Sequence, residues 1–476
     1  MTEPSGAAVV DAATRPIPTD FVLGVATAAY QIEGAAHADG RTDSIWDVFS
    51  RVPGAVAGGD TGDVACDHYH RFRDDIALMA DMGVDAYRFS TSWARVRPDG
   101  GPINRKGLDF YSRLVDELLD KGIAPWLTLY HWDLPQALEE KGGWANRDTA
   151  SRFVEYVEAV HGALGDRVAS WTTLNEPWCS AFLGYLSGDH APGRHDPESA
   201  LAAGHHLLLA HGLATRAIRE FRSGVQVGIT LYLTVPDPVD PTDPDDVEAT
   251  RLVDAQLNRF FLDPIFRGAY PSDLMTDVEP FAFERRIRDG DLAIISSPID
   301  FLGVNYYRGE GVSARPDPEA APAVTPTGRP SRSPFPIAEG IHLHSRGLPR
   351  TGMDWEIQPE GLTRLLRRLG DEYAGDVAMY VTENGAAFDD APDADGFVDD
   401  VGRTRFLRDH LAATLDARDA GANVQGYFYW SFMDNFEWEY GYDKRFGLVR
   451  VDYPTQARTP KASAREYRRM ISGRSL

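Results

Sequence analysis

Eight short apolar segments recur along the chain, and they restrict its fold more than any other feature of the sequence. Longer stretches with helical periodicity lie between them; in residues 107–123, for example, apolar side chains fall at Leu108, Tyr111, Leu114, Val115, Leu118 and Leu119. This alternation predicts repeated βα units and a parallel sheet. Eight such units predict an α/β fold, a closed (β/α)8 TIM barrel with elaborated βα loops. The predicted strands are residues 21–29, 85–93, 124–132, 170–177, 225–231, 300–307, 377–385 and 424–435.

Polar or aromatic side chains stand where most of these segments end. In a barrel all the carboxyl ends meet at one face, which holds the active site, whereas an open sheet would use fewer of them. The side chains in question are Gln31, Arg88, His131 with Trp132, Asn175 with Glu176, Asn305 with Tyr307, Glu383 with Asn384, and Trp430.

No long low-complexity linker divides the chain, so we expect one catalytic domain over residues 21–476 after a flexible segment of residues 1–20. Residues 236–248 and 315–336 are rich in proline and read as surface loops. Loops that follow barrel strands form the rim of the active site. Residues 315–336 are therefore expected to border the site entrance, with a passive surface insertion as the alternative.

The amino-acid composition limits the kinds of binding partner that the protein can have. The chain has 48 basic and 72 acidic residues and a formal net charge of −24, which disfavours nucleic acid and anionic membranes. The two cysteines, Cys66 and Cys179, argue against a disulfide framework and are expected to be buried packing residues in a reducing compartment. No signal-peptide pattern begins the chain and no apolar run approaches the roughly 18 residues of a membrane span, so a cytoplasmic protein is expected.

The stretch Thr172–Trp178, TTLNEPW, changes abruptly from a strand pattern to Asn-Glu-Pro. Pro177 is expected to push Glu176 towards an extended conformation. Glu176 and Glu383 end the fourth and seventh predicted strands and could therefore face each other across the barrel mouth. Two facing carboxylates are the minimum apparatus for glycoside hydrolysis, one protonated to release the leaving group and one ionised to attack the sugar.

The neighbours of the two glutamates suggest their roles. If Arg88 and the Tyr307 hydroxyl contact Glu383, they hold that carboxylate charged. Arg88 could instead be a structural ion-pair partner. Glu176 has only Asn175 beside it in sequence and would feel the charge of Glu383, which raises its pKa. This predicts Glu176 as the acid, and later the base, and Glu383 as the nucleophile.

Seven motifs, TAAYQIEG, YRFSTSW, LTLYHWDLP, TLNEPW, GVNYY, VTENG and FYWSFMDNFEWEYGYDKRFGLVRVDY, occur in this order between Phe21 and about Tyr453. They resemble the successive signatures of glycoside hydrolase family 1, the retaining β-glucosidases and their relatives. The resemblance covers nearly the whole catalytic chain. It implies the same roles for Glu176 and Glu383.

The resemblance also implies how a substrate is held. The side chains that would grip the hydroxyls of the terminal sugar are Gln31, His131, Asn175, Glu437 and Trp438. Trp430 would pack under the sugar's apolar face, Asn305 and Tyr307 would sit beside the glutamates, and Phe446 would close the inner wall. Trp132, Trp178 and Trp355 resemble positions nearer the leaving group. A cis peptide between Trp430 and Ser431 is implied as well.

Two branch points of the family can be read in this sequence. Plant thioglucosidases resemble the pattern with Gln in place of the acid/base, whereas Glu176 is present here. Members that act on 6-phosphorylated sugars replace the residues at Glu437 and Trp438, which are intact. A carboxylate near O6 would repel a phosphate, so an unphosphorylated sugar is favoured.

No cofactor or metal is expected. The histidines lack the HExxH spacing and a cysteine partner set, and we expect packing and capping roles for His68, His70, His205, His206 and His211. The glycines of GGDTGD do not form a GxGxxG turn after a strand.

The sequence as a whole predicts a retaining exo-β-glycosidase that releases terminal β-D-glucosyl residues from small β-glucosides and short oligosaccharides such as cellobiose. Three alternatives stay open: a sugar-binding barrel without catalysis, a preference for β-galactosides or β-fucosides, and transfer of the sugar to an acceptor alcohol. The leaving-group preference and any homo-oligomer are not defined by the sequence.

Overall fold

A closed barrel of eight parallel strands forms the centre of the molecule. The computed structural model describes residues 15–221, 224–318 and 320–476. Going round the barrel, the strand order is β1, β11, β10, β7, β5, β4, β3, β2, so the last strand closes against the first. The strands are β1 (Val22–Ala26), β2 (Ala86–Ser90), β3 (Ala124–Tyr130), β4 (Ser170–Asn175), β5 (Gln226–Tyr232), β7 (Phe301–Asn305), β10 (Ala378–Asn384) and β11 (Val424–Trp430). All eight predicted strands are confirmed.

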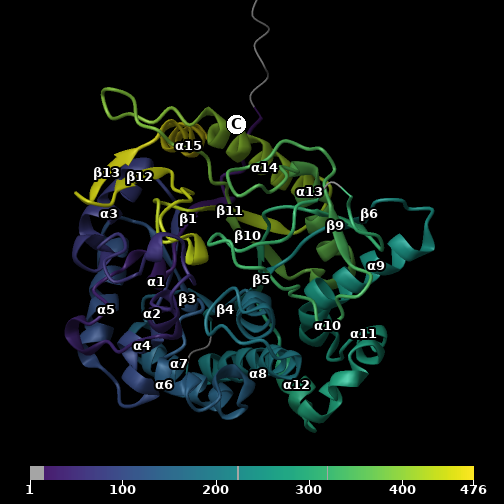
Figure 1. Ribbon diagram of the computed structural model, residues 1–476. Helices are drawn as coiled ribbons and strands as arrows, with labels where there is room; N and C mark the ends of the chain where they lie inside the picture. Colours follow the sequence, from purple (N-terminus) through teal and green to yellow (C-terminus); the bar gives the residue numbers. More distant parts are fainter. Residues whose placement is uncertain (1–14, 222–223, 319) are drawn as a thin grey trace, which may run out of the picture.

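Helices form a ring around these strands (Figure 1). The amphipathic pattern of α5 is confirmed in most positions, since Tyr111, Leu114 and Leu118 are buried, whereas Leu119 is 44% exposed at the edge of the helix. The helices are α1 (Ala29–Ile32), α2 (Ile45–Ser50), α3 (His68–Met82), α4 (Trp93–Val96), α5 (Arg105–Asp120), α6 (Gln136–Glu139), α7 (Asp148–Leu164), α8 (Pro197–Phe221), α9 (Pro244–Asp254), α10 (Phe260–Arg267), α11 (Ser272–Asp277), α12 (Asp291–Ile295), α13 (Pro359–Leu369), α14 (Val401–Asp419) and α15 (Ala462–Gly473).

Aromatic rings fill the inside of the barrel. The ring of Trp126 lies 4.6 Å from Tyr380, 5.0 Å from Phe428 and 5.4 Å from Phe301, measured between centroids. Gly24 makes room for this cluster, because a Cβ there would come within 2.4 Å of the Phe428 ring. The barrel is therefore a packed core, closed beneath the strand ends.

The loops after the strands carry two small sheets. β6 (Pro236–Pro238), β8 (Glu310–Ser313) and β9 (His342–His344) form one beside α9, and the hairpin of β12 (Val449–Asp452) and β13 (Ala457–Pro460) forms the other. Of the two predicted proline-rich loops, residues 236–248 are a loop only in part, because Pro236–Pro238 form β6 and α9 begins at Pro244, whereas residues 315–336 lie between β8 and β9.

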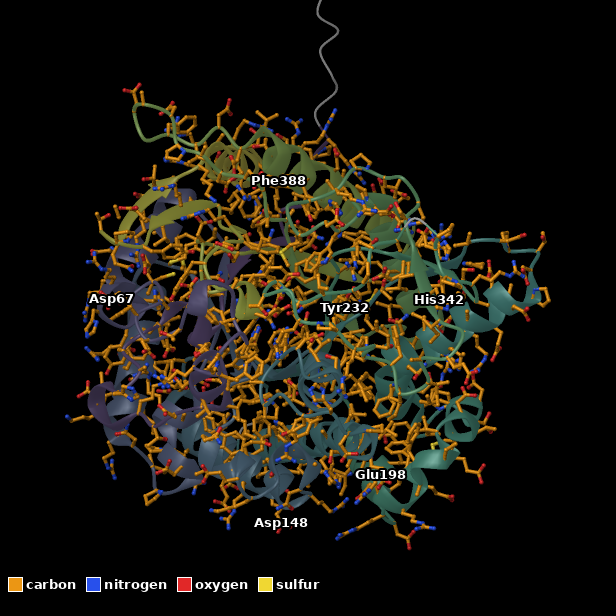
Figure 2. The ribbon with its side chains drawn as sticks, viewed as in Figure 1. Asp67, Asp148, Glu198, Tyr232, His342 and Phe388 are labelled. Atoms are coloured by element: carbon orange, nitrogen blue, oxygen red, sulfur yellow. The ribbon has the colours of Figure 1, made fainter. Side chains whose placement is uncertain are left out.

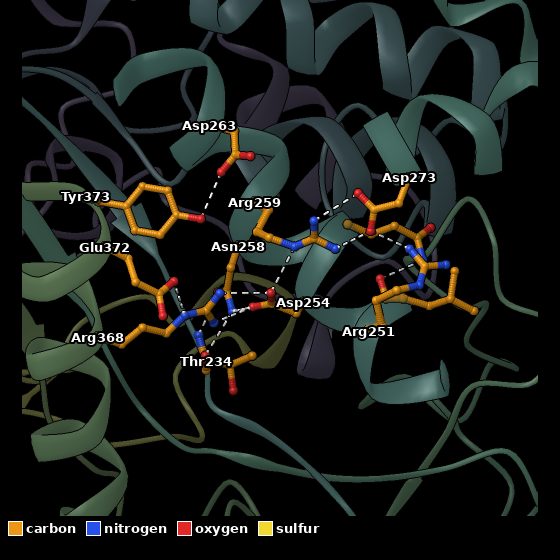
Figure 3. A network of polar contacts seen from close by, with 12 residues as sticks. Thr234, Arg251, Asp254, Asn258, Arg259, Asp263, Asp273, Arg368, Glu372 and Tyr373 are labelled. Atoms are coloured by element: carbon orange, nitrogen blue, oxygen red, sulfur yellow. Dashed lines mark hydrogen bonds and ion pairs between the residues drawn. The ribbon is translucent and has the colours of Figure 1, made fainter. Parts of the chain in front are cut away.

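A network of ion pairs ties together the helices on the β5 and β7 side (Figure 3). Arg259 bridges Asp254 of α9, at 3.0 Å, and Asp273 of α11, at 2.6 Å. Arg368 of α13 binds Asp254 at 2.6 Å, and Arg251 of α9 binds Asp273 at 2.7 Å. Shared carboxylates thus fix α9, α11 and α13 relative to one another.

The two ends of the described chain lie together. Residues 1–14, most of the segment expected to be flexible, fall outside the described residues. Residues 15–20 are in contact with the barrel helices: Ile17 is 2% exposed and its amide donates to the Arg474 carbonyl at 2.7 Å. Arg15 forms ion pairs of 2.6 Å with Asp416 and Asp419 of α14.

Across residues 15–221, 224–318 and 320–476, none of the helices combines the length and the apolar character that a membrane crossing requires.

We predict that Ile17→Ala lowers the free energy of unfolding by about 2–5 kcal/mol, because the substitution leaves a cavity in a closed site. Urea unfolding followed by circular dichroism measures the change. Val52→Ala is the control, since Val52 is 47% exposed and its loss should cost about 0.5 kcal/mol or less. If the two variants unfold at the same urea concentration, residues 15–20 do not unfold together with the barrel.

Candidate active site

Glu176 lies at the point where β4 turns into a helical segment. Its amide donates to the Thr230 carbonyl of β5 at 2.9 Å, and its own carbonyl accepts from the Cys179 amide at 3.0 Å. The first bond continues the sheet and the second begins a helical turn, so the chain must change direction within one residue. Glu176 has a φ of 45°, and the extended conformation expected from Pro177 is therefore wrong. A side chain in this region of φ indicates local strain that the surroundings impose.

The two oxygens of the Glu176 carboxyl have different partners. Oε1 accepts from the Asn305 amide at 2.7 Å, and Oε2 accepts from the Cys179 thiol at 3.4 Å. The side chain is buried, with an exposure of 4% for the residue. Burial, and after it the charge of Glu383, raises the pKa of Glu176 to about 8. This carboxyl is suited to hold a proton at neutral pH.

Glu383, the next-to-last residue of β10, is bound by a cation and a hydroxyl. Its Oε1 accepts from Arg88 at 2.5 Å and its Oε2 from the Tyr307 hydroxyl at 2.8 Å, as expected from the sequence. Burial raises the pKa of Glu383, whereas the Arg88 guanidinium and the Tyr307 hydroxyl act in the opposite direction. The ionised form of Glu383 is thus supported by contacts that Glu176 does not share.

Asn175 joins four strands at the barrel mouth. Its Oδ1 accepts from Arg88 at 2.7 Å and from Asn305 at 3.1 Å, and its Nδ2 lies 3.0 Å from Nε2 of His131. Because Asn175 donates there, His131 carries its proton on Nδ1, which is buried and has no hydrogen-bond partner among the described residues. Burial, with the nearby Arg88 charge, lowers the pKa of His131 well below its usual range, so the ring is neutral.

A cavity of about 300 Å³ opens above these residues. The predicted residues that line it are His131, Trp132, Glu176, Trp178, Tyr307, Trp355, Glu383, Trp430, Glu437, Trp438 and Phe446. Four predicted residues, Gln31, Arg88, Asn175 and Asn305, are buried and do not belong to its lining. Three of these four orient cavity residues through the hydrogen bonds given above.

Gln31 and Glu437 each present an oxygen with no hydrogen-bond partner within the described part of the chain. The Gln31 amide donates to Asn435 at 3.1 Å and to the Phe436 carbonyl at 2.8 Å, which leaves Oε1 free. Burial, then the charges of Glu439 and Glu383, raises the pKa of Glu437 well above its usual range. Buried polar atoms are rarely left without partners, so these oxygens point to a polar ligand.

Aromatic rings form most of the cavity walls. Trp430 stacks on His131 with a centroid distance of 5.7 Å, and Trp438 packs on Trp132 at 4.5 Å. Trp355 meets Tyr307 at 5.4 Å, and both rings pack against the cluster that contains Trp430 and Phe446. The peptide between Trp430 and Ser431 is cis, as the family resemblance implied.

A family model described as glycosyl hydrolase family 1 matches residues 13–475. The chain belongs to glycosyl hydrolase family 1. It is 50% identical over 462 residues to thermostable β-glucosidase B of Thermobispora bispora, covering 96% of this chain and 91% of that protein. It is 47% identical over 475 residues to a bifunctional β-D-glucosidase/β-D-fucosidase of Bifidobacterium breve, covering 97% and 99%. The crystal structure of a psychrophilic β-glucosidase from Micrococcus antarcticus superposes with a TM-score of 0.94 at 54% identity, covering 96% of this chain and 98% of that one.

The predicted family and its barrel fold are thus confirmed, and the chain is a glycoside hydrolase. The motifs in the sequence did not identify every residue that lines the cavity. The additional polar residues of its lining are Cys179, His190, Tyr232, Arg308, Glu310, Glu439 and Tyr440.

Some of these residues could have been found from the sequence. Arg308 directly follows Tyr307, and Glu439 is two residues beyond Glu437. His190 gives no such signal; it reaches the cavity from a loop and pairs with Glu439 at 2.7 Å. Tyr232, the last residue of β5, lies near the centre of Figure 2.

Cys179 is buried, as expected, but it also contacts Glu176 and lines the cavity. The expectation that residues 315–336 border the entrance is confirmed, because Pro334 and Phe335 belong to the lining.

The histidines considered for metal binding have structural partners. His205 contacts Asp291 at 2.9 Å, His206 contacts the Trp144 carbonyl at 2.9 Å, and His211 contacts the Thr173 hydroxyl at 2.7 Å. In the described ranges, His, Cys, Asp and Glu side chains nowhere gather in threes that could hold a metal ion.

We predict that two substitutions of Cys179, by Ala and by Ser, shift the alkaline limb of the pH profile of kcat/KM in opposite directions. If Glu176 acts as the acid, activity requires its protonated form, and kcat/KM should fall as the pH rises through about 8. The thiol donates to the ionised carboxylate and lowers its pKa; Cys179→Ala should therefore move the limb up by about half to one pH unit, and Cys179→Ser, a stronger donor, should move it down.

The pH dependence of kcat/KM measures both shifts, and Cys66→Ala is the matched control because Cys66 is the other buried cysteine. Shifts of the same sign in both Cys179 variants would contradict the thiol's contact with Oε2.

Proposed function

We propose that this chain is a retaining exo-β-glycosidase that releases terminal β-D-glucosyl residues from small β-glucosides. The observation that carries the proposal is the pair of buried glutamates on one cavity with opposite surroundings, one bound by Arg88 and one by a neutral amide and a thiol. Such a division of protonation between two carboxyls is what glycoside hydrolysis requires.

In the first step Glu383 attacks the anomeric carbon, and the bond from that carbon to the leaving oxygen breaks. Oε1 of Glu176 accepts from the Asn305 amide at 2.7 Å, whereas Oε2 has only the longer thiol contact of 3.4 Å, so the proton that Glu176 gives to the leaving oxygen is assigned to Oε2. The products are a glycosyl ester of Glu383 and the free alcohol. Formation of the ester removes the charge of Glu383, so the pKa of Glu176 falls and its carboxylate can act as a base.

In the second step water attacks the same carbon, and Glu176 accepts the proton of that water. The ester bond breaks and Glu383 regains its charge, which Arg88 and Tyr307 stabilise. Two inversions at one carbon return the β configuration. An alcohol in place of water would give transglycosylation by the same route.

Polar atoms in the cavity wall and just behind it have no hydrogen-bond partner among the described residues, and they support a sugar as the ligand. The Nδ1 proton of His131 is a donor, Gln31 Oε1 is an acceptor, and the Glu437 carboxyl can accept or, when protonated, donate. Sugar hydroxyls donate and accept, so they can satisfy all three groups. Trp430 offers an apolar plane to the C–H face of the ring. A phosphate at O6 would bring further negative charge to a place where burial and the charges of Glu439 and Glu383 already raise the pKa of Glu437 well above its usual range.

The relative from Bifidobacterium breve, named as a β-D-glucosidase/β-D-fucosidase, supports β-fucosides as a second substrate of this site. Cellobiose is included among the proposed substrates.

We predict different outcomes for the two catalytic glutamates with a p-nitrophenyl β-glucoside. Glu383→Ala should lose activity, and azide should restore turnover to an α-glucosyl azide, since the azide takes the place of the carboxylate. Glu176→Ala should be slowed about 10²- to 10⁴-fold with cellobiose, whose alcohol leaves only with acid assistance, and less with the p-nitrophenyl glucoside, from which azide should yield a β-glucosyl azide. Product anomers are identified by proton NMR, and the reverse pairing of anomers would exchange the two roles.

We also predict that the p-nitrophenyl β-glucoside is cleaved and its 6-phosphate is not. A panel with the β-galactoside and β-fucoside then ranks specificity by kcat/KM. If the protein binds glucose but cleaves no member of the panel, the non-catalytic sugar-binding alternative replaces the proposed enzyme.

A further inference from the structure

Six charged side chains are buried together behind the loop that follows β11. They comprise three carboxylates and three cations, so their formal charges sum to zero. Five have side chains that are 0–1% exposed, and the sixth, that of Arg445, is 21% exposed. We name this group the six-charge cluster: Asp390, Asp400, Arg403, Asp434, Arg445 and Lys461.

Asp434 is the centre of one half of the cluster. Its Oδ1 accepts from Lys461 Nζ at 2.7 Å and from the Gly447 amide at 3.0 Å, and its Oδ2 accepts from Arg445 at 2.7 Å. Lys461 also binds Asp390. Both carboxylate oxygens of Asp434 are therefore occupied by charged or backbone donors.

Arg403 of α14 is the centre of the other half. It binds Asp400 at 2.5 Å and Asp390 at 2.8 Å, and it donates to the Arg445 carbonyl at 2.6 Å. A further donor contact reaches the Ala386 carbonyl at 3.3 Å. The cluster thus connects the loop after β10, which begins just beyond Glu383, to the loop after β11.

The loop after β11 carries Glu437, Trp438 and Phe446 into the cavity. Asp434 fixes it on both sides of these residues: Asp434 itself precedes Glu437, and the Gly447 amide that it binds follows Phe446. The approach at Gly447 is close, because a Cβ there would come within 2.0 Å of the Asp434 amide nitrogen. The six-charge cluster therefore holds both ends of the sugar-facing part of the loop.

We propose that the six-charge cluster is a positioning device that sets Glu437 and Trp438 at the correct distance from Glu383. This inference rests on the proposed function, in which Glu437 holds the sugar near O6. A buried charge that loses its partner is strongly unfavourable, so the loop must move to bring water to the carboxylate that remains. Such a movement weakens the hold on the sugar before it affects the two catalytic glutamates.

Arg445 is the most suitable member for a test, because its partial exposure lets a substituted side chain be accommodated. The chain offers a closely matched control in Arg147, whose side chain is 22% exposed and binds the buried Asp291, also at 2.7 Å. Arg147 is not among the residues that line the cavity. The variants are Arg445→Met and Arg445→Lys, each paired with the same substitution at Arg147.

The substrates are the p-nitrophenyl β-glucoside and β-xyloside, which differ only in the hydroxymethyl group that bears O6. We expect Arg445→Met to raise KM for the glucoside about tenfold while kcat changes by about threefold or less, because displacement of a positioning group by a fraction of an ångström is costly. The glucoside-to-xyloside ratio of kcat/KM should fall, Arg445→Lys should fall between wild type and Arg445→Met, and both Arg147 variants should keep the wild-type ratio.

An unchanged ratio in Arg445→Met, or an equal change in Arg147→Met, would overturn the inference and leave the cluster a purely structural role. If Arg445→Met does not fold, Arg445→Lys carries the test, since a smaller fall of the same ratio is expected. Failure of the proposed function looks different, because wild type would then cleave neither substrate.

Discussion

The guanidinium of Arg88 is the contact on which the arrangement of the site depends. It lies inside the barrel mouth, 1% exposed, and reaches from β2 to Glu383 on β10 and Asn175 on β4. A cation at this depth is tolerable because Nη1 binds Glu383 and Nη2 binds Asn175, although Nε has no hydrogen-bond partner among the described residues. The buried Glu383 carboxylate depends in the same way on its charged donor. Since the eight strands are hydrogen-bonded in a closed ring, these contacts across the mouth fix the relative height of the strands that carry the chemistry.

The different environments of the two glutamates follow from this contact. Glu383 receives a charged donor and a phenol, whereas Glu176 receives an amide and a thiol, although both are buried to a similar degree. Burial alone would raise both pKa values together. The asymmetry comes from the partners, which lie on β2, on β7 and just after it, and in the helical segment after β4. The chemistry is therefore a property of the closed barrel and not of any one motif.

The sequence predicted the elements whose signals are local. All eight strands were found, because each is a short apolar run and most of these runs end in a polar or aromatic side chain. The contact of Arg88 and Tyr307 with Glu383 could be anticipated because closure of the barrel brings strand ends together. Eleven of the predicted residues line the cavity: His131, Trp132, Glu176, Trp178, Tyr307, Trp355, Glu383, Trp430, Glu437, Trp438 and Phe446.

The features that were missed depend on tertiary contacts. The positive φ of Glu176 arises from hydrogen bonds to β5 and to the following helical turn, which override the local preference before Pro177. His190 reaches the cavity through its loop and its bond to Glu439. The contact of Cys179 with Glu176 exists only because the segment after β4 coils immediately, which the composition of that segment does not reveal.

The contact between the first described residues, from Arg15, and the carboxyl-terminal residues has a practical consequence. The Leu476 amide donates to the Arg15 carbonyl, and Arg474 binds Asp85 and the Phe21 carbonyl, both of which precede barrel strands. The place where the ends meet is therefore on the side of the barrel opposite the cavity. A surface, a carrier domain or a second enzyme attached at the carboxyl end would leave the mouth turned towards the solution, so immobilisation there should not obstruct the passage of substrate.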